Sequence, residues 1–170
     1  MAVAAVTVTG CKKDNNSLPA QDTTSGGGDV PDVQEEYVDL GLPSGTLWCE
    51  QNEPNDADTT FGFYDYNAAK AAFGDGMPTV DQLRELKDEC QWTWTGTGYS
   101  VVGANGNSIF LPAVGYRWYD GTVQQEGVMG NYWSSTQDGQ NNAWALVFNA
   151  DNVSVTNHHR DQGHSVRLVK

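Results

Sequence analysis

The residues of this chain that could do chemistry are concentrated between Gly130 and the C-terminal Lys170. Here short polar side chains alternate with apolar ones, and on strands such polar side chains face away from the core. Asn, Asp and His offer hydrogen-bond donors and acceptors and lose little rotamer freedom when ordered, which suits ligand recognition. The candidate ligand-binding residues are Asn141, Asn142, Trp144, Asn149, Asp151, Asn152, Asn157, His158, His159, Asp161 and His164. We expect the polar members, with Gln162 beside them, to form one exposed surface.

The three histidines raise the question of a metal site or a catalytic centre. Adjacent residues on a strand point to opposite faces, so His158 and His159 cannot converge on one ion. We therefore favour surface recognition over metal binding. The sequence contains no H-E-x-x-H motif and no Ser-His-Asp order typical of a hydrolase. We expect no catalytic residue, no metal ligand and no cofactor, and hence a protein that is not an enzyme.

The apolar residues of the same stretch are expected to build the scaffold beneath this surface. They include Trp133 and Trp144, which we expect to be core aromatics, although Trp144 is also a candidate binding residue. The other apolar members are Leu146, Phe148, Val153, Val155, Val166 and Leu168.

The elements that must position this stretch lie upstream. A Gly-Leu-Pro-Ser-Gly turn at 41–45 predicts two short flanking strands. Apolar residues at helical spacing predict one helix that ends at Gly74, and a capping box of Thr79 and Gln82 predicts the start of a second. Alternation predicts a half-buried strand at 91–95. The Asn105-Gly106 pair predicts a hairpin turn with positive φ at both residues. Together these features indicate an α+β fold, with two helices packed on small antiparallel sheets and a long loop-rich half.

The net charge of the chain excludes several classes of binding partner. The 170-residue chain has 22 acidic and 9 basic residues, a formal net charge of -13. Nucleic acids and anionic membranes need clustered Lys and Arg, so neither is an expected partner. Cys49 and Cys90 could form a disulfide in an exported protein, or remain as two buried thiols.

The N-terminal residues resemble a signal that determines cellular location. Residues 1–10 are small and mostly apolar, and Val8-Thr9-Gly10-Cys11 resembles the lipobox of bacterial lipoproteins, in which the Cys is lipidated after cleavage. Residues 11–36 are polar and Gly-rich, as in a disordered tether. We therefore expect a signal remnant at 1–10, lipidation of Cys11, and contact with a membrane only through this anchor.

The remaining chain, residues 37–170, matches a known family in several ordered motifs: VDLGLPSGTLW, MPT-x-x-QL-x-EL, CQWTW, NGNSIFLPAVGYR, YWSST and GHSVRLVK. It resembles the bacterial C-type lectin-like domains of surface lipoproteins, of the major paralogous domain type. It also resembles the variable proteins diversified by retroelements and the formylglycine-generating-enzyme-like branch of that fold. The resemblance implies a C-type lectin-like domain, diversified positions near the C-terminus, and Arg167 as an internal hydrogen-bond clamp. Glu53-Pro54-Asn55 matches a calcium-binding tripeptide of lectins but lacks its Trp-Asn-Asp partner motif, so we expect a solvated acidic loop and no dependence on calcium.

These features lead to a functional expectation: a domain on the bacterial outer membrane that binds a protein or a glycan through its C-terminal polar surface. Two alternatives stay open. One is a structural or adhesin-subunit paralogue without a diversified site, and the other is a degenerate formylglycine-generating-type enzyme.

Overall fold

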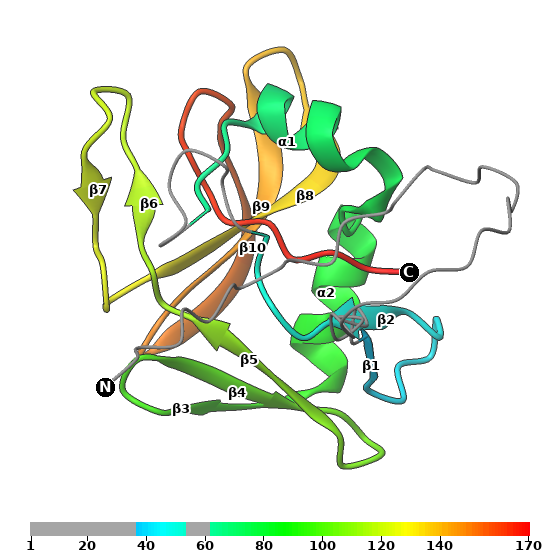
Figure 1. Ribbon diagram of the computed structural model, residues 1–170. Helices are drawn as coiled ribbons and strands as arrows, with labels where there is room; N and C mark the ends of the chain where they lie inside the picture. Colours follow the sequence, from blue (N-terminus) through cyan, green and yellow to red (C-terminus); the bar gives the residue numbers. More distant parts are fainter. Residues whose placement is uncertain (1–36, 54–61) are drawn as a thin grey trace, which may run out of the picture.

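The computed structural model describes residues 37–53 and 62–170 of the chain (Figure 1). The signal remnant and tether expected at 1–36, with Cys11, lie outside the described residues, as do Pro54 and Asn55. In the described part, no helix is both long and apolar enough to cross a membrane.

The described chain forms two helices and several small antiparallel sheets, so the expected α+β class is confirmed. The helices are α1 (Tyr66–Phe73) and α2 (Val80–Glu89), with a 3-10 turn, η1 (Gly74–Gly76), between them. The strands are β1 (Tyr37–Asp39), β2 (Leu47–Cys49), β3 (Gln91–Trp94), β4 (Gly98–Val102), β5 (Ser108–Pro112), β6 (Tyr116–Arg117), β7 (Val123–Gln124), β8 (Gly130–Asp138), β9 (Asn142–Asn149) and β10 (Asn152–His159). They pair as β1-β2, β3-β4-β5, β6-β7 and β10-β9-β8, with every pairing of these strands antiparallel.

Local capping sets the bounds of both helices. The Asp65 carboxylate accepts a hydrogen bond from the Ala68 N–H at 2.8 Å and begins α1, and Gly74 ends it at a φ of 50°. The predicted capping box is confirmed: the Thr79 hydroxyl accepts from the Gln82 N–H, while the Gln82 side chain accepts from the Thr79 N–H.

The hairpin between β4 and β5 exists, but its turn differs from the predicted type. Gly106 has a φ of 87°, whereas Asn105 has no positive φ. The loop is instead closed by bonds from Gly103 N–H to Asn107 O at 2.9 Å and from Gly106 N–H to Gly103 O at 3.0 Å. This longer loop needs only one left-handed residue, and the Asn105 side chain stabilises it by accepting from the Asn107 N–H.

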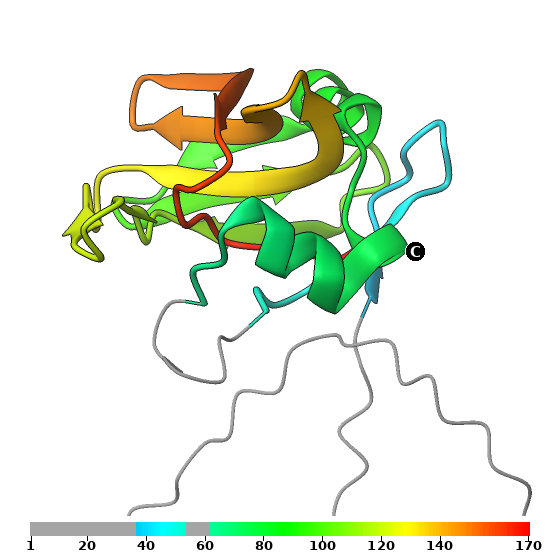
Figure 2. The ribbon, with the colours of Figure 1, turned by 90° about the horizontal axis from the view of Figure 1, so that it is seen from above.

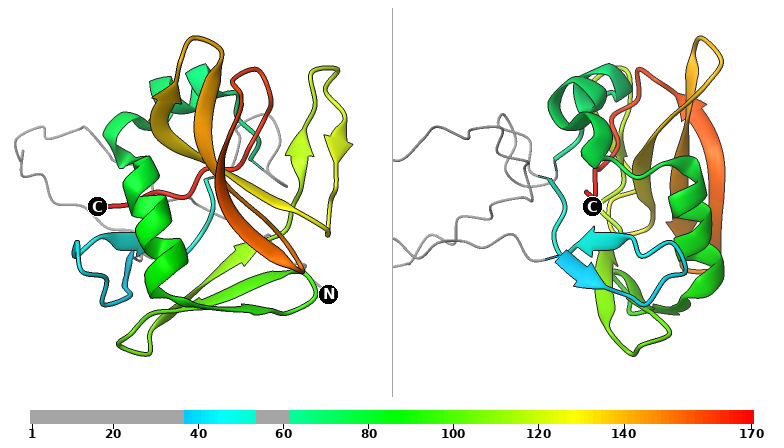
Figure 3. Two further views of the ribbon diagram at one scale, coloured as in Figure 1. Left: turned by 180° about the vertical axis from the view of Figure 1, so that it is seen from behind. Right: turned by 90° about the vertical axis from the view of Figure 1, so that its right-hand side faces the viewer.

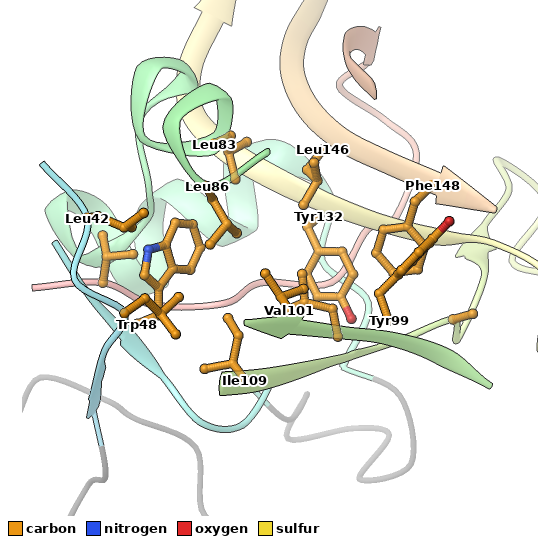
Figure 4. Close-up of a cluster of buried hydrophobic side chains, with 14 residues drawn as sticks. Leu42, Trp48, Leu83, Leu86, Tyr99, Val101, Ile109, Tyr132, Leu146 and Phe148 are labelled. Atoms are coloured by element: carbon orange, nitrogen blue, oxygen red, sulfur yellow. The ribbon is translucent and has the colours of Figure 1, made fainter. Parts of the chain in front are cut away.

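The core consists of two clusters on either side of the β8–β9 pair. On one face, Tyr132, Leu146 and Phe148 pack with Trp48 and with residues of α2 and the β3-β4-β5 sheet (Figure 4). On the other face, Trp133 and the small apolar side chains of β9 pack with Tyr66 and the rest of α1. Both faces of β9 are therefore covered, and the alternation in its sequence does not produce a solvent-facing surface along its length.

The last residues of the chain run as a buried extended segment, 162–169, between β8 and the chain that leads into α1 (Figure 2). Ser165 exchanges backbone hydrogen bonds with β8, and His164 exchanges two with Tyr64 at 2.9 Å. Its end pairs with β2 through two hydrogen bonds between Leu47 and Lys170. This segment therefore joins the first strands of the domain to its C-terminal sheet.

Arg167 is the internal clamp that was expected. Its side chain is 2% exposed, and the guanidinium donates to the Asn52 side chain at 2.8 Å and to the carbonyls of Cys49, Glu50 and Phe110. Burial lowers the pKa of this guanidinium, while the nearby Tyr132 hydroxyl, Glu50 and Glu53 act in the opposite direction.

Two further expectations are corrected. Glu53 is 1% exposed, not part of a solvated loop, because its N–H donates to Val166 O at 2.9 Å and draws it against the C-terminal segment. Cys90 has a free thiol, so the disulfide between Cys49 and Cys90 is absent. The two cysteines belong to different parts of the core: Cys49 lies in the cluster with α1, whereas Cys90 packs against the cluster with α2.

Candidate functional site

The β9–β10 register divides the expected polar surface into separate regions. Asn149 pairs with Asn152 at one end of the two strands, and Asn142 pairs with His159 at the other. Seven residue steps separate these ends, a distance of roughly 24 Å at 3.4 Å per residue. The predicted single surface is therefore wrong.

The region at the β9–β10 turn has a structural role. The Asn149 side chain accepts hydrogen bonds from the N–H groups of Asp151 and Asn152, both at 3.0 Å, and so holds the turn. Asp151 and Asn152 are exposed, but Asn149 is half-buried and committed to the backbone.

A second region lies around Trp144 and Asn157, which are opposite each other in the register and share a face of the sheet. Trp144 is half-buried, and the Arg84 guanidinium lies 5.1 Å from its ring centre. The Asn157 side chain donates to the Asp138 carboxylate. Asn141 is exposed and Asn142 is half-buried near this end of the strands. The expectation that Trp144 is a core aromatic is thus only partly met.

His164 does not belong to any surface, because its residue is fully buried in the C-terminal segment. Its ring stacks on Trp133 at 3.9 Å between ring centres, and His158 meets it edge-on at 5.0 Å. Burial, followed by the charge of His158, holds the pKa of His164 well below 6.5. Gln162 is also buried, at 8% exposure, and its side-chain oxygen lies 3.1 Å from His158 Nδ1. Both residues were wrongly expected at the surface, because alternation cannot show that another segment covers a strand.

Two of the remaining candidates, His159 and Asp161, lie beside two aromatic residues that sequence reasoning missed, whereas His158 packs on the buried His164 and Gln162. We call this set the aromatic–histidine face: Trp118, Tyr119, His159 and Asp161. Trp118 and Tyr119 are 39% and 50% exposed, and their rings meet edge-on at 4.4 Å. The Tyr119 ring meets His159 at 5.6 Å, and His159 Nδ1 lies 3.6 Å from the Asp161 carboxylate.

The hairpin β6–β7 carries the aromatic residues and projects from the side of the domain opposite α2 (Figures 1 and 3). It is attached to the C-terminal segment by two backbone hydrogen bonds between Arg117 and Gly163, at 2.8 and 2.9 Å. A Cβ at Gly163 would lie 2.9 Å from Arg117 side-chain atoms, so this close approach favours glycine. The Gln162 side chain also donates to the Tyr119 hydroxyl at 3.4 Å.

The sequence did contain a signal for this face. Tyr116, Trp118 and Tyr119 stand close together in a stretch rich in turn residues, where large aromatics have few neighbours to cover them. Aromatic side chains in a loop are more informative than polar ones in a strand, because exposed Trp and Tyr commonly anchor binding partners.

The face has the chemistry of recognition. Within residues 37–53 and 62–170, no group of three or more His, Cys, Asp or Glu side chains is arranged to hold a metal ion. Two rigid aromatic rings supply apolar contact area, while the His159–Asp161 pair supplies polar contacts at the rim.

The buried His164 gives a pH-dependent expectation. Its pKa is below 6.5 in the folded protein, so the unfolded chain takes up a proton that the folded chain does not. The stabilising contribution is present above about pH 6.5 and is lost as pH falls, by at most about 1.4 kcal/mol per pH unit. We expect the difference in unfolding free energy between wild type and His164→Gln to shrink between pH 7 and 5, as measured by urea unfolding.

The matched control is His159→Gln, whose side chain is 42% exposed. A constant free-energy difference between wild type and His164→Gln across this pH range would contradict the buried, neutral state of His164.

Comparisons with known proteins place the chain in a family without assigning an activity. Neither a curated protein nor a solved structure matches it significantly. One family model matches residues 82–169, just over half of the chain, and spans nearly all of α2, the strands β3 to β10 and the C-terminal segment. The chain therefore belongs to the family described as a domain of unknown function, DUF8237.

Proposed function

We propose that this protein is a non-enzymatic, calcium-independent ligand-binding domain at the bacterial cell surface, and that it binds a protein through the aromatic–histidine face. The observation that carries this proposal is the exposed run of rings formed by Trp118, Tyr119 and His159. Monomeric domains seldom expose adjacent large aromatics unless a partner covers them.

A protein ligand fits this face better than an ion or a small anion. Trp and Tyr are enriched among the residues that dominate protein-binding energy, and a surrounding polar rim excludes water from them. Val123 and Val128, which are 39% and 51% exposed, add apolar area on the same stretch of chain. Arg117, on β6 of the hairpin, is half-buried, and Asp161 gives the rim a negative charge.

We also propose that the domain has a C-type lectin-like fold. Three features support this: two helices flank small antiparallel sheets, the C-terminal segment returns to pair with β2, and a loop-rich half carries the candidate site. On the same resemblance, His158, His159 and Asp161 are positions that a retroelement could diversify. A template repeat beside the gene would support this part of the proposal.

The proposed location rests on the lipobox-like Val8–Cys11 run. A precursor carrying a full export signal should partition into detergent when expressed in a bacterium with lipoprotein processing. Cys11→Ser should remain in the aqueous phase. Equal partitioning of the two proteins would end the proposal of lipid anchoring.

The binding proposal predicts the behaviour of selected peptides. Peptides enriched from a random displayed library on the wild-type protein should bind Tyr119→Ala and Trp118→Ala at least about tenfold more weakly, because each aromatic anchor is worth roughly 2 kcal/mol or more. Exposed substitutions change stability by only about 0.5 kcal/mol, so both variants should melt near wild type. Affinity is measured by fluorescence polarisation of the synthetic peptides.

The matched control is Phe110→Ala, since Phe110 is 41% exposed but belongs to the other three-stranded sheet. If the enriched peptides bind all three variants as they bind wild type, the face is not a protein-binding site. The structural or adhesin-subunit alternative would then be favoured.

A further inference from the structure

A second site lies between α1 and β8, at the end of β10, and is lined by residues other than those of the aromatic–histidine face. It is a hollow of about 410 Å³ lined by Tyr66, Asn67 and Lys70 of α1, Ser135 and Gln137 of β8, and Arg160. None of these residues belongs to the aromatic–histidine face or is used in the proposed function.

The charge of this hollow is opposite to that of the protein. The chain has a net charge of -13, yet the lining contains one Lys, one Arg and no acidic residue. The described part of the chain provides no ion-pair partner within 4 Å for either cation; its Lys and Arg ion pairs involve Arg84 and Lys87. The positive charge is therefore available to an anionic ligand.

The Arg160 guanidinium is held in place by uncharged partners. It lies 4.8 Å from the ring centre of Tyr66, and it donates to the Gln140 carbonyl at 3.1 Å and to the Asn67 side-chain oxygen. Its Nε is buried without a hydrogen-bond partner. These contacts fix the group but leave its charge uncompensated, as expected for a preorganised anion site.

The remaining polar side chains are uncommitted. In the described residues, the side chains of Lys70, Ser135 and Gln137 make no hydrogen bond with the protein, whereas the Tyr66 hydroxyl is occupied by the Ser135 carbonyl at 2.7 Å. A hydroxyl and an amide group beside two cations can bind a ligand that has hydroxyl groups as well as a negative charge.

We propose that this hollow binds a carboxylate-bearing sugar of the uronic-acid class, with the carboxylate facing Lys70 and Arg160 and the ring hydroxyls facing Ser135, Gln137 and Asn67. The volume holds a sugar ring and not merely an ion. The neutral hydroxyl and amide groups can both donate and accept hydrogen bonds, which matches the hydroxyls of a sugar.

The test is a titration of the full ¹⁵N-labelled chain, followed by NMR at constant ionic strength, with sodium glucuronate, glucose and sodium acetate. Glucuronate should cause saturable shifts of the Asn67 and Gln137 side-chain amides, while glucose should cause none. Equal effects of glucose and glucuronate, or no saturable shift, would overturn the proposal. Acetate that binds as tightly as glucuronate would overturn the sugar specificity.

Lys70→Met should weaken glucuronate binding about tenfold, because it removes the proposed charged hydrogen bond from the half-buried Lys70 side chain to the ligand carboxylate. The matched control is Lys87→Met on α2, outside the hollow, which should bind as wild type.

Arg160→Gln gives a second measurement, and its ¹⁵N spectrum shows whether it remains folded. If Lys70→Met and folded Arg160→Gln both bind like wild type, the assigned site is wrong. Tyr119→Ala should leave glucuronate binding unchanged, so this result is independent of the proposed protein-binding face.

Discussion

Truncating Trp133 to Ala should remove about 3–5 kcal/mol of folding free energy, which is most of the stability of a typical domain. The Trp133 side chain is fully buried, its Nε1 donates to the Tyr64 carbonyl at 2.9 Å, and its ring stacks on His164. Tyr66 meets it edge-on at 5.7 Å. The substitution therefore leaves a large cavity where β8, α1 and the C-terminal segment meet, and it removes one of the two hydrogen bonds that the Tyr64 carbonyl accepts.

Trp144→Ala is the matched control, because it removes the same side chain from a half-buried position. The Trp144 ring makes a cation–π contact with the Arg84 guanidinium, and such a contact contributes about 0.5–1 kcal/mol at an exposed site. Chemical unfolding of both variants measures the difference. A loss for Trp133→Ala no larger than that for Trp144→Ala would contradict the central position of Trp133.

The elements that could be predicted from sequence are those with a local cause. The Thr79–Gln82 capping box, the Gly74 stop and the Gln91–Trp94 alternation each act within a few residues, and each gives the expected element. Helix caps and short strands report local preferences, so one sequence is enough to read them.

The candidate site was predicted poorly because its geometry depends on contacts between distant segments. Alternation placed His158 and His164 on one displayed surface, but His164 belongs to the C-terminal segment, which is buried between β8 and the chain before α1. Likewise β9 has core on both faces, so its polar residues reach solvent chiefly at its ends. Nothing in a periodic pattern reveals which faces a later segment will cover.

The aromatic residues of the hairpin β6–β7 were also missed because their environment depends on distant contacts, but here the residues are exposed and not buried. Trp118 and Tyr119 are large aromatics, which sequence reasoning tends to assign to a core. They are exposed because the hairpin projects from the domain and is attached mainly at Arg117 and Gly163. The aromatic–histidine face exists only because this attachment brings Trp118 and Tyr119 beside His159 and Asp161.

Arg167→Ala should be as damaging as Trp133→Ala, although it removes a charged side chain. The guanidinium satisfies Asn52 Oδ1 and the carbonyls of Cys49, Glu50 and Phe110. Each acceptor left unsatisfied in a buried site costs about 1–3 kcal/mol, and water entering the space recovers part of this. We expect a net loss of about 3–5 kcal/mol, measured by urea unfolding.

Arg167→Lys separates the role of charge from that of geometry. An ammonium group keeps the charge but has three donors without the planar fork, so it cannot reach the same four acceptors. We expect Arg167→Lys to recover less than half of the stability lost in Arg167→Ala. The exposed control Arg84→Ala, whose side chain is 47% accessible, should change stability by no more than about 1 kcal/mol. If Arg167→Lys unfolds like wild type, the buried charge and not the hydrogen-bond geometry joins β2, β5 and the C-terminal segment.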